Sequence, residues 1–375
     1  MRLIIFRNYR EDLQLSMKAY ADCIAKELRK SKPNWEIIEY YPKSLLIRLS
    51  RKDNVISKII DLINRYIYYP LQLKGAIEGD VYHIIDHANS LLMKYLNNNK
   101  VVVTCHDLIP LLMDTGYFKG IKKPFLALRI FKISMNYLSK AVKIFADSKS
   151  TKNDLVTKLN IDGNKIIYIP LGLFYSYKVC SKEERISYKK YIGVDEKTLL
   201  ILNVGNTFFY KNYERVLRVL SLLPERILGK DWLFVRVGVK SKSSFLDYHL
   251  GGRRIEKIKE VGVVSYEELE KYYNAADVLF FPSLYEGFGM PVLEAMHCGL
   301  PVIASNVASL SEVGSDAVIY VNTYNVDDML EKLLLVLSDE NLRSEMRIKG
   351  MQRAKLFSWD KTIELMISNY EEIAK

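Results

Sequence analysis

The feature that most constrains the fold of this chain is the alternation of short apolar runs with stretches of helical periodicity. Such alternation is typical of parallel β-sheets that are covered by helices on both faces. We therefore predict an α/β architecture with doubly wound, Rossmann-like sheets. The predicted strands are 3–6, 37–40, 81–85, 101–105, 143–146 and 166–169 in the first half, and 199–204, 233–237, 261–264, 278–282, 302–304 and 318–321 in the second.

The length of 375 residues exceeds what one hydrophobic core usually serves, so six strands in each half predict two similar domains. Proline and glycine at 170 and 172 interrupt regular structure between the halves, and a helix is expected to begin near Ser181. We place the domains at 1–176 and 177–357, facing each other across a cleft. The tail at 358–375 is predicted to form one more amphipathic helix.

Composition and cysteine usage exclude several classes of protein. Apolar residues make up 49% of the chain and charged residues 26%, as in a globular protein rather than a disordered one. The sequence has no apolar run of the roughly 18 residues that a membrane-spanning helix needs, and its apolar N-terminal stretch is too short for a signal peptide. The four cysteines form no C-x-x-C pair, which favours a reducing cytoplasm and argues against a zinc site.

The excess of positive charge is confined to the first half of the chain. Residues 1–180 hold 29 Lys and Arg against 16 Asp and Glu, whereas residues 181–375 hold 26 against 28. Nucleic acid, an anionic membrane surface or an anionic acceptor would each explain this excess. The alternative is a charge that only keeps the protein in solution.

A strand–loop–helix segment near residue 290 carries the strongest functional signal. The apolar run 278–282 ends at a proline, a loop with Gly287 and Gly289 follows, and Pro291 suits the first turn of a helix. The free N–H groups at a helix start, together with the helix dipole, form an anion site. A phosphate or diphosphate is therefore the expected ligand.

Two glutamates eight positions apart frame this segment. Glu286 in the loop is placed to reach a neutral sugar just beyond the phosphates. Glu294, about one turn into the helix, is placed to accept hydrogen bonds from ribose hydroxyls. The alternative is an ordinary strand–helix turn with a surface glutamate, but the full pattern is more specific than a single Gly-x-Gly.

A second loop follows the strand predicted at 199–204. Gly205 permits a tight exit from that strand, and Lys211 is able to place a positive charge on a phosphate. The alternative for Lys211 is a solvated loop lysine.

Histidines follow two predicted strands of the first half. His106 and Asp107 lie at the carboxyl end of the strand at 101–105, the edge at which open α/β sheets bind ligands. A histidine there can hydrogen-bond a sugar hydroxyl or transfer a proton, and the alternative is a capping pair that fixes the loop. His83 and His87 flank the end of the preceding strand, where contact with an acceptor and a structural role are both open.

The segment from Glu286 to Glu294 resembles the E-x7-E signature of glycosyltransferase family 4, a group of retaining enzymes with the GT-B fold. The resemblance continues at 272–277, 295–305 and 312–314, so it covers most of the second half. It implies that Glu286 contacts the donor sugar, that Glu294 contacts the ribose and that the loop backbone holds the diphosphate. The donor-binding residues expected on this basis are Gly205, Asn206, Lys211, Gly287, Phe288, Gly289, Met290, Pro291 and Glu294.

Other segments resemble the same family. Residues 204–212 match its V-G-x-x-x-x-x-K-N segment, which implies that Lys211 neutralises the leaving diphosphate. Many members have Arg directly after the Gly, whereas this chain has Asn206, so one cation is expected to act in place of two. Residues 106–110 match an H-D-x-x-P segment that faces the reaction centre in the family. The catalytic residues expected are Glu286, His106 and Lys211, and the acceptor-side residues are Asp107 and His87.

The resemblance also implies features at the two ends of the chain. The final helix at 358–375 crosses back to the N-terminal domain in GT-B enzymes. Many members carry a glycine-rich loop after the first strand, whereas residues 8–18 of this chain contain no glycine. The geometry of the acceptor site is therefore expected to depart from the family at this loop.

Taken with the resemblance, the sequence predicts an enzyme that moves a hexosyl group from a nucleoside-diphosphate sugar to a saccharide or lipid-linked acceptor with retention. The combination of H-D-L-I-P with L-Y-E-G-F-G is similar to mannosyl- and rhamnosyltransferases of polysaccharide synthesis, so GDP-mannose is the first candidate donor and a UDP-sugar the other. The sequence contains no D-x-D motif, so no metal is expected, and no separate cofactor is predicted.

Two basic stretches that also hold apolar residues, 43–52 and 117–125, are suited to an anionic membrane surface. We therefore predict a cytoplasmic protein that binds peripherally to the inner face of a membrane. The alternatives are another GT-B enzyme, such as a sugar-nucleotide epimerase or a phosphorylase, and a basic nucleic-acid-binding protein. The sequence holds no recognised nucleic-acid motif, so nucleic acid is not an expected partner.

Overall fold

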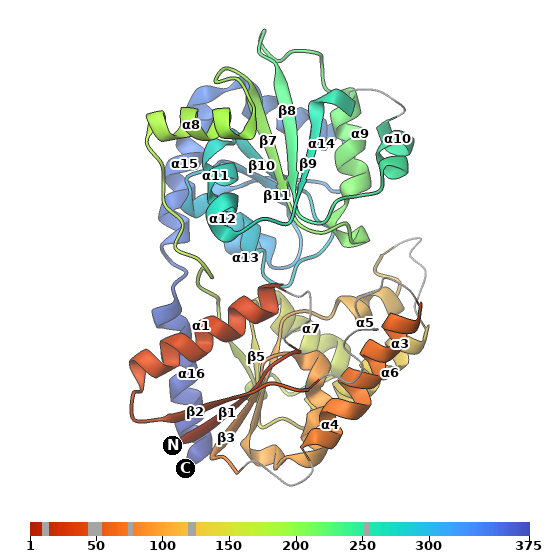
Figure 1. The fold of residues 1–375 in the computed structure, drawn as a ribbon, viewed down its shortest axis with the longest axis vertical. Coiled ribbons are helices and arrows are strands. Elements are labelled where there is room, and N and C mark those ends of the chain that lie inside the picture. The colour runs from red at the N-terminus through yellow and green to blue at the C-terminus, as the bar shows by residue number, and fades with distance from the viewer. Residues whose placement is uncertain (10–14, 44–54, 74–77, 119–124, 251–254) are drawn as a thin grey trace. The chain divides into compact units, whose positions relative to one another are not determined.

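The computed structural model describes residues 1–9, 15–43, 55–73, 78–118, 125–250 and 255–375, which divide into two compact units. Unit 1 comprises Met1–Phe174 and Ser358–Lys375, and unit 2 comprises Tyr175–Phe357. Within the described residues each unit contains a six-stranded sheet whose paired strands all run parallel, with helices beside it (Figure 1). The predicted α/β class with two doubly wound sheets is confirmed.

The sheet of unit 1 has the strand order β2-β1-β3-β4-β5-β6, so the order reverses between β1 and β3. Each strand lies within two residues of a predicted one, because a short apolar run marks each of them, although the edge strand β2 is only partly buried. The strands are β1 (Arg2–Phe6), β2 (Glu36–Tyr40), β3 (Val81–Ile84), β4 (Val101–Cys105), β5 (Lys143–Ala146) and β6 (Ile166–Tyr168).

The helices of unit 1 cover both faces of its sheet. One face packs beneath α6, η2 and α5, whose apolar side chains share a core with alternate strand residues. On the other face α1 contacts α16. The helices are α1 (Leu15–Ser31), α3 (Val55–Ile63), η1 (Asn64–Tyr68), α4 (Tyr69–Gln72), η2 (His87–Tyr95), η3 (Asn98–Lys100), α5 (Ile109–Asp114), α6 (Phe125–Leu138), α7 (Lys149–Leu159), η4 (Gly163–Lys165) and α16 (Trp359–Ala374).

A buried chain of hydrogen bonds fastens the final helix to the sheet of unit 1. The Tyr370 hydroxyl lies 2.8 Å from His83 Nδ1, and His83 Nε2 lies 2.8 Å from Thr104 Oγ1. Thr104 Oγ1 is also 2.8 Å from the Tyr20 hydroxyl of α1. Burial lowers the pKa of His83 to about 3, so the ring is neutral and needs one donor and one acceptor, which these neighbours supply. His83 therefore has a structural role.

Replacing Tyr370 with phenylalanine is expected to lower the free energy of unfolding by about 1–3 kcal/mol, because it leaves a buried ring nitrogen of His83 without its partner. Urea unfolding followed by circular dichroism measures the change. Tyr248→Phe is the matched control, since Tyr248 is 82% exposed. Equal stability of the two variants would contradict this role for the network.

The sheet of unit 2 has the order β12-β11-β10-β7-β8-β9, so its order reverses between β7 and β10. If β7 is counted as strand 1 and the sheet is read from β9, the order is 3-2-1-4-5-6. This is the order of dinucleotide-binding folds. The strands are β7 (Leu199–Val204), β8 (Trp232–Val237), β9 (Ile258–Gly262), β10 (Val278–Phe281), β11 (Val302–Ser305) and β12 (Ile319–Val321).

One strand of unit 2 departs from its prediction. The apolar run 261–264 suggested a strand there, but β9 begins at Ile258 because its residues pair in register with β8, starting from Phe234. This edge strand is only half-buried, so its hydrophobic pattern is weak. The helices of the unit are α8 (Lys182–Ile192), η5 (Phe209–Lys211), α9 (Tyr213–Leu222), α10 (Ser243–Leu250), η6 (Ile255–Lys257), α11 (Tyr266–Ala275), α12 (Met290–His297), α13 (Leu310–Gly314), η7 (Ser315–Ala317), α14 (Val326–Ser338) and α15 (Glu340–Ala354).

Several predicted features fall on residues that the structure does not describe. They include 44–52 and 119–124 from the two basic stretches and 10–14 from the loop without glycine. Of the helices that are described, each is too short or too polar to cross a bilayer.

Candidate active site

The topology of unit 2 brings two predicted loops together. β7 and β10 are neighbours at the point where the strand order reverses, which is where open α/β sheets bind ligands beyond the carboxyl ends of their strands. The backbone N–H of Leu284 donates to the Tyr210 carbonyl oxygen at 2.7 Å. Asn212 Nδ2 donates to the Pro282 carbonyl oxygen at 3.0 Å, so the two loops are held as one surface.

Lys211 and Glu286 meet on this surface. Lys211 Nζ lies 2.7 Å from Glu286 Oε1, and both side chains are at least four-fifths buried. The ammonium group also lies 5.2 Å from the ring centre of Phe281. Because the pair is largely shielded from water, an ammonium and a carboxylate are presented together at the edge where a ligand would bind.

The start of α12 has the geometry expected of an anion site. Gly289 precedes the helix with φ = 98°, and a Cβ atom there would lie 2.5 Å from Leu310 Cδ2. Within the described residues no side chain caps the helix start. Pro291 has no N–H, and the N–H groups of Val292 and Leu293 donate to the Gly289 carbonyl oxygen, so among the described residues the Met290 N–H is the group left for a ligand. Gly287, Met290 and Pro291 are partly exposed there, whereas Phe288 is buried.

Glu294 lies deeper in unit 2 than Glu286. Its Oε2 accepts a hydrogen bond from the Tyr273 hydroxyl at 2.6 Å, and its Oε1 accepts one from the Tyr177 hydroxyl at 3.1 Å. Burial raises the pKa of Glu294 to about 7, and the two tyrosine hydroxyls only partly oppose that rise. A ribose hydroxyl would therefore share this carboxyl group with two tyrosines, neither of which the sequence singled out.

The raised pKa of Glu294 predicts a pH-dependent contribution to stability. Between about pH 4.5 and 7 the folded carboxyl binds a proton that the unfolded one has lost, so the wild type loses stability as the pH rises. Glu294→Gln removes this titration. The free energy of unfolding of the variant, relative to wild type, is expected to increase by about 3 kcal/mol across that window. Urea unfolding at several pH values checks this, and a difference that does not change with pH would contradict it.

Asn206 and Arg236 shape the loop that follows β7. Asn206 Oδ1 accepts a hydrogen bond from the Phe208 N–H at 3.1 Å, as in an Asx turn. Arg236 Nη2 donates to the Gly205 carbonyl oxygen at 3.1 Å, while its Nη1 donates to Val239 and to Glu260. Arg236 is almost fully buried and so positions the loop. The sequence signal for it was a lone arginine inside the apolar strand β8.

Both ring nitrogens of His106 make hydrogen bonds in this structure. Its Nδ1 lies 2.5 Å from Asp147 Oδ2, and its Nε2 lies 2.8 Å from the Ile85 carbonyl oxygen. Burial alone would lower its pKa, but the carboxylates of Asp147 and Asp86 and the hydrogen bond to the Ile85 carbonyl oxygen together outweigh burial and raise the pKa to about 9. The imidazolium then donates from both nitrogens. In this state the side chain joins the ends of β3, β4 and β5, and its expected catalytic role stays a prediction.

Other polar residues of unit 1 gather where its strand order reverses. Asn8, two residues after β1, donates from Nδ2 to Asp86 Oδ2 at 2.8 Å, and Asn89 Nδ2 donates to Asn8 Oδ1 at 2.7 Å. His87 is buried beside them, and its Nδ1 has no hydrogen-bond partner among the described residues. Asp107 accepts from the Ile109 N–H at 2.9 Å and so fixes the start of α5. Asn8 and Asn89 were missed because no motif marks them.

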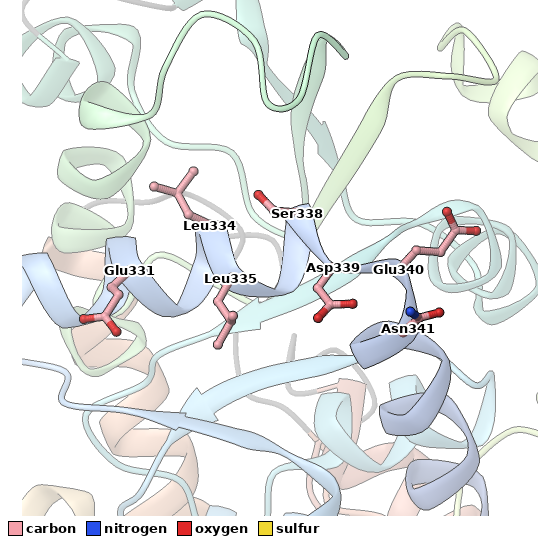
Figure 2. Close-up of a pocket in the computed structure, with 7 residues that line it drawn as sticks. All are labelled: Glu331, Leu334, Leu335, Ser338, Asp339, Glu340 and Asn341. Carbon is pink, nitrogen blue, oxygen red and sulfur yellow. The ribbon is translucent and has the colours of Figure 1, made fainter.

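Among its described lining residues, a pocket of about 590 Å³ elsewhere in unit 2 lacks the cation that the surface with Lys211 and Glu286 provides. Figure 2 shows its lining residues along one continuous stretch, the end of α14 and the start of α15. Three of the described lining residues are the carboxylates Glu331, Asp339 and Glu340, and none is a cation. A diphosphate would be repelled there, so the surface with Lys211 and Glu286 is the better candidate.

Comparison with known proteins finds mannosyltransferases among the relatives of this chain. The chain is 29% identical over 313 residues to the serotype-specific mannosyltransferase WbdA of Escherichia coli, covering 79% of this chain and 37% of that protein. It is 30% identical over 247 residues to the O-antigen chain mannosyltransferase B of E. coli, covering 62% of this chain and 61% of that one. The chain thus spans less than two thirds of the length of either relative.

A solved structure gives the fold. Sucrose-phosphate synthase from Thermosynechococcus elongatus superposes with a TM-score of 0.76 at 17% identity, over 100% of this chain and 99% of that one. Residues 184–353, all of them in unit 2, match the family described as Glycosyl transferases group 1. The second half of the chain is therefore similar to the group 1 glycosyltransferases, and the two parallel α/β units have the GT-B fold.

Proposed function

We propose that this protein transfers a hexosyl group, with mannosyl as the first candidate, from a nucleoside-diphosphate sugar to a hydroxyl of a saccharide or lipid-linked acceptor. The observation that carries the proposal is the contact of Lys211 Nζ with Glu286 Oε1, 2.7 Å apart at the edge where the sheet order of unit 2 reverses. The names of the relatives, both mannosyltransferases, support the choice of sugar.

The proposed chemistry separates charge, since the sugar becomes oxocarbenium-like as the diphosphate leaves. In this proposal Lys211 and the Met290 N–H at the start of α12 stabilise the leaving oxygens. Glu286 holds Lys211 in the free protein. With donor bound, its carboxylate orients the sugar and stabilises the positive charge that develops on it. Retention at the anomeric carbon, and neutralisation of the diphosphate without a metal, are parts of the same proposal.

The acceptor is assigned to the polar cluster of unit 1. There the carboxylate of Asp86 and the imidazole of His87 are the groups best suited to hydrogen-bond a hydroxyl, since His106 already donates from both ring nitrogens. Burial lowers the pKa of His87, so its ring is neutral near pH 7 and able to accept a hydrogen bond. Asp107 is engaged at the start of α5 and is a weaker candidate.

The test is an activity assay on the full chain with GDP-mannose and UDP-glucose, each with free and lipid-linked saccharides as acceptors. Release of nucleoside diphosphate together with a glycosylated product is expected, and nuclear magnetic resonance gives the anomeric configuration. EDTA is expected to leave the rate unchanged. Conversion of the donor to an isomeric nucleotide sugar would show an epimerase instead, and glycosyl transfer to inorganic phosphate a phosphorylase.

The peripheral membrane association is tested separately. Flotation of the full chain with vesicles of an anionic and of a neutral phospholipid is expected to recover it with the anionic ones only, because the excess positive charge lies in the first half. An absence of binding at low salt would remove this part of the proposal and leave the glycosyl transfer standing.

A further inference from the structure

A second cationic site lies in unit 2, away from the loops of the candidate active site. A cavity of about 380 Å³ is lined by Leu199 at the start of β7, by Asp277 just before β10 and by Pro301 just before β11. It is therefore at the edge of the sheet where these strands begin, whereas the loops with Lys211 and Glu286 follow the strand ends. The helices α8 and α15, which line it, lie on one side of the unit (Figure 1).

The cavity is strongly basic. Among the described residues that line it, seven are Lys or Arg and three are acidic. Its cations come from α8, from the segment before β8 and from α15, so residues distant in sequence converge on it. They include Lys182, Arg185, Lys189, Lys230, Arg343 and Arg347.

The buried carboxylate on the cavity wall is already neutralised. Asp277 is bonded to Arg185 Nη2 at 2.7 Å and to Lys189 Nζ at 3.2 Å, and it accepts the backbone N–H of Leu200 at 2.8 Å. The other two acidic residues, Glu196 and Glu340, are exposed. The remaining cations of the cavity therefore have little fixed negative charge to balance them.

Arg347 is the clearest of these uncompensated cations. Its guanidinium makes no hydrogen bond or ion pair within the part of the chain that the structure describes, although the side chain is partly buried. Burial and the nearby positive charge of Arg185 lower the pKa of Arg347. Two guanidinium groups held close together, with one free of partners, form an arrangement that an anion with several oxygens would stabilise.

We propose that this cavity binds a phosphate-type anion, such as a phosphomonoester or a diphosphate, at a site distinct from the candidate donor site. Its volume is within the usual range for a small-molecule site. Guanidinium groups bind phosphate oxygens in a bidentate manner. A ligand with a single carboxylate would offer fewer acceptor oxygens to cations that come from several walls of the cavity. The phosphate belongs either to a free small molecule or to a lipid headgroup, and the proposal does not rest on the glycosyl-transfer function.

The test is calorimetric titration of the full chain with inorganic pyrophosphate at low salt. Wild type is expected to show two sites. Arg347→Gln is expected to weaken one of them about tenfold or more, since it removes a charged donor without breaking a hydrogen bond or ion pair among the described residues. Lys211→Ala is expected to weaken the other and to leave the site at Arg347. Lys242→Ala, an exposed lysine of the same unit, serves as the control.

A second arm identifies the source of the phosphate. Flotation with phosphatidylcholine vesicles, with and without phosphatidic acid, is repeated for wild type and for Arg347→Gln. Binding to phosphatidic acid that Arg347→Gln weakens points to a lipid headgroup, and pyrophosphate binding without this vesicle effect points to a free ligand. The proposal is overturned if Arg347→Gln and Lys182→Ala both bind pyrophosphate like wild type, or if Lys211→Ala alone abolishes all binding.

Discussion

Replacement of Lys211 with alanine is expected to lower kcat about a hundredfold or more, with the fold intact. The ammonium group is placed to stabilise the oxygens of the leaving diphosphate, and loss of one such preorganised contact typically costs about 10²–10³ in rate. The measurement is release of nucleoside diphosphate at saturating donor. The effect is expected in kcat rather than in KM alone, because the negative charge grows as the bond to the sugar breaks.

Lys242→Ala is the matched control for this prediction, because Lys242 is an exposed lysine of the same unit. Its kcat is expected to stay within about twofold of wild type, as for most surface substitutions. Circular dichroism establishes that both variants are folded. A folded Lys211→Ala variant with more than a tenth of the wild-type kcat would remove Lys211 from the catalytic assignment.

Replacement of Glu286 with glutamine is expected to lower kcat at least about tenfold. The variant keeps the size of the side chain but loses the negative charge that orients the sugar and faces its developing positive charge. The same assay measures the change. Glu345→Gln, on an exposed glutamate of α15, is the matched control and is expected to behave like wild type.

The contact between the two residues makes a further outcome measurable. Because Lys211 and Glu286 form one ion pair, the loss in the double variant is expected to be smaller than the product of the two single losses. If the loss of kcat in the double variant equals the product of the two single losses, the contact in the free protein has no effect on turnover.

Much of the fold was predictable because a buried strand requires a short run of apolar residues that are consecutive in the sequence. β4, β5 and β7 lie at the predicted residues, since a short apolar run bounded by polar or helical stretches admits few other structures. The edge strand β9 was misplaced because its residues are only weakly apolar and its position depends on pairing with β8. The segment from Glu286 to Glu294 was also readable, since a glycine loop before a helix is itself a local pattern.

The partners of the site residues were not predictable, because they come from distant parts of the chain. Asp147, which holds His106 in a doubly donating state, is 41 residues away from it. Tyr177, which shares the Glu294 carboxyl group, is 117 residues away. No local pattern records such a contact. The hydrogen-bond partners of His106 and the raised pKa of Glu294 therefore follow from the packing of strands and helices alone.

The sequence by itself determined the two α/β units, the positions of the strands other than β9, and the glutamates and lysine proposed to act on the donor, since each depends on residues close together in the chain. Only the tertiary structure decided that Lys211 meets Glu286, that Arg236 supports the loop beside them and that a basic cavity gathers around Arg347. The physical reason is the strand order, which places β7 beside β10 and gathers side chains from several elements at each edge of the sheet.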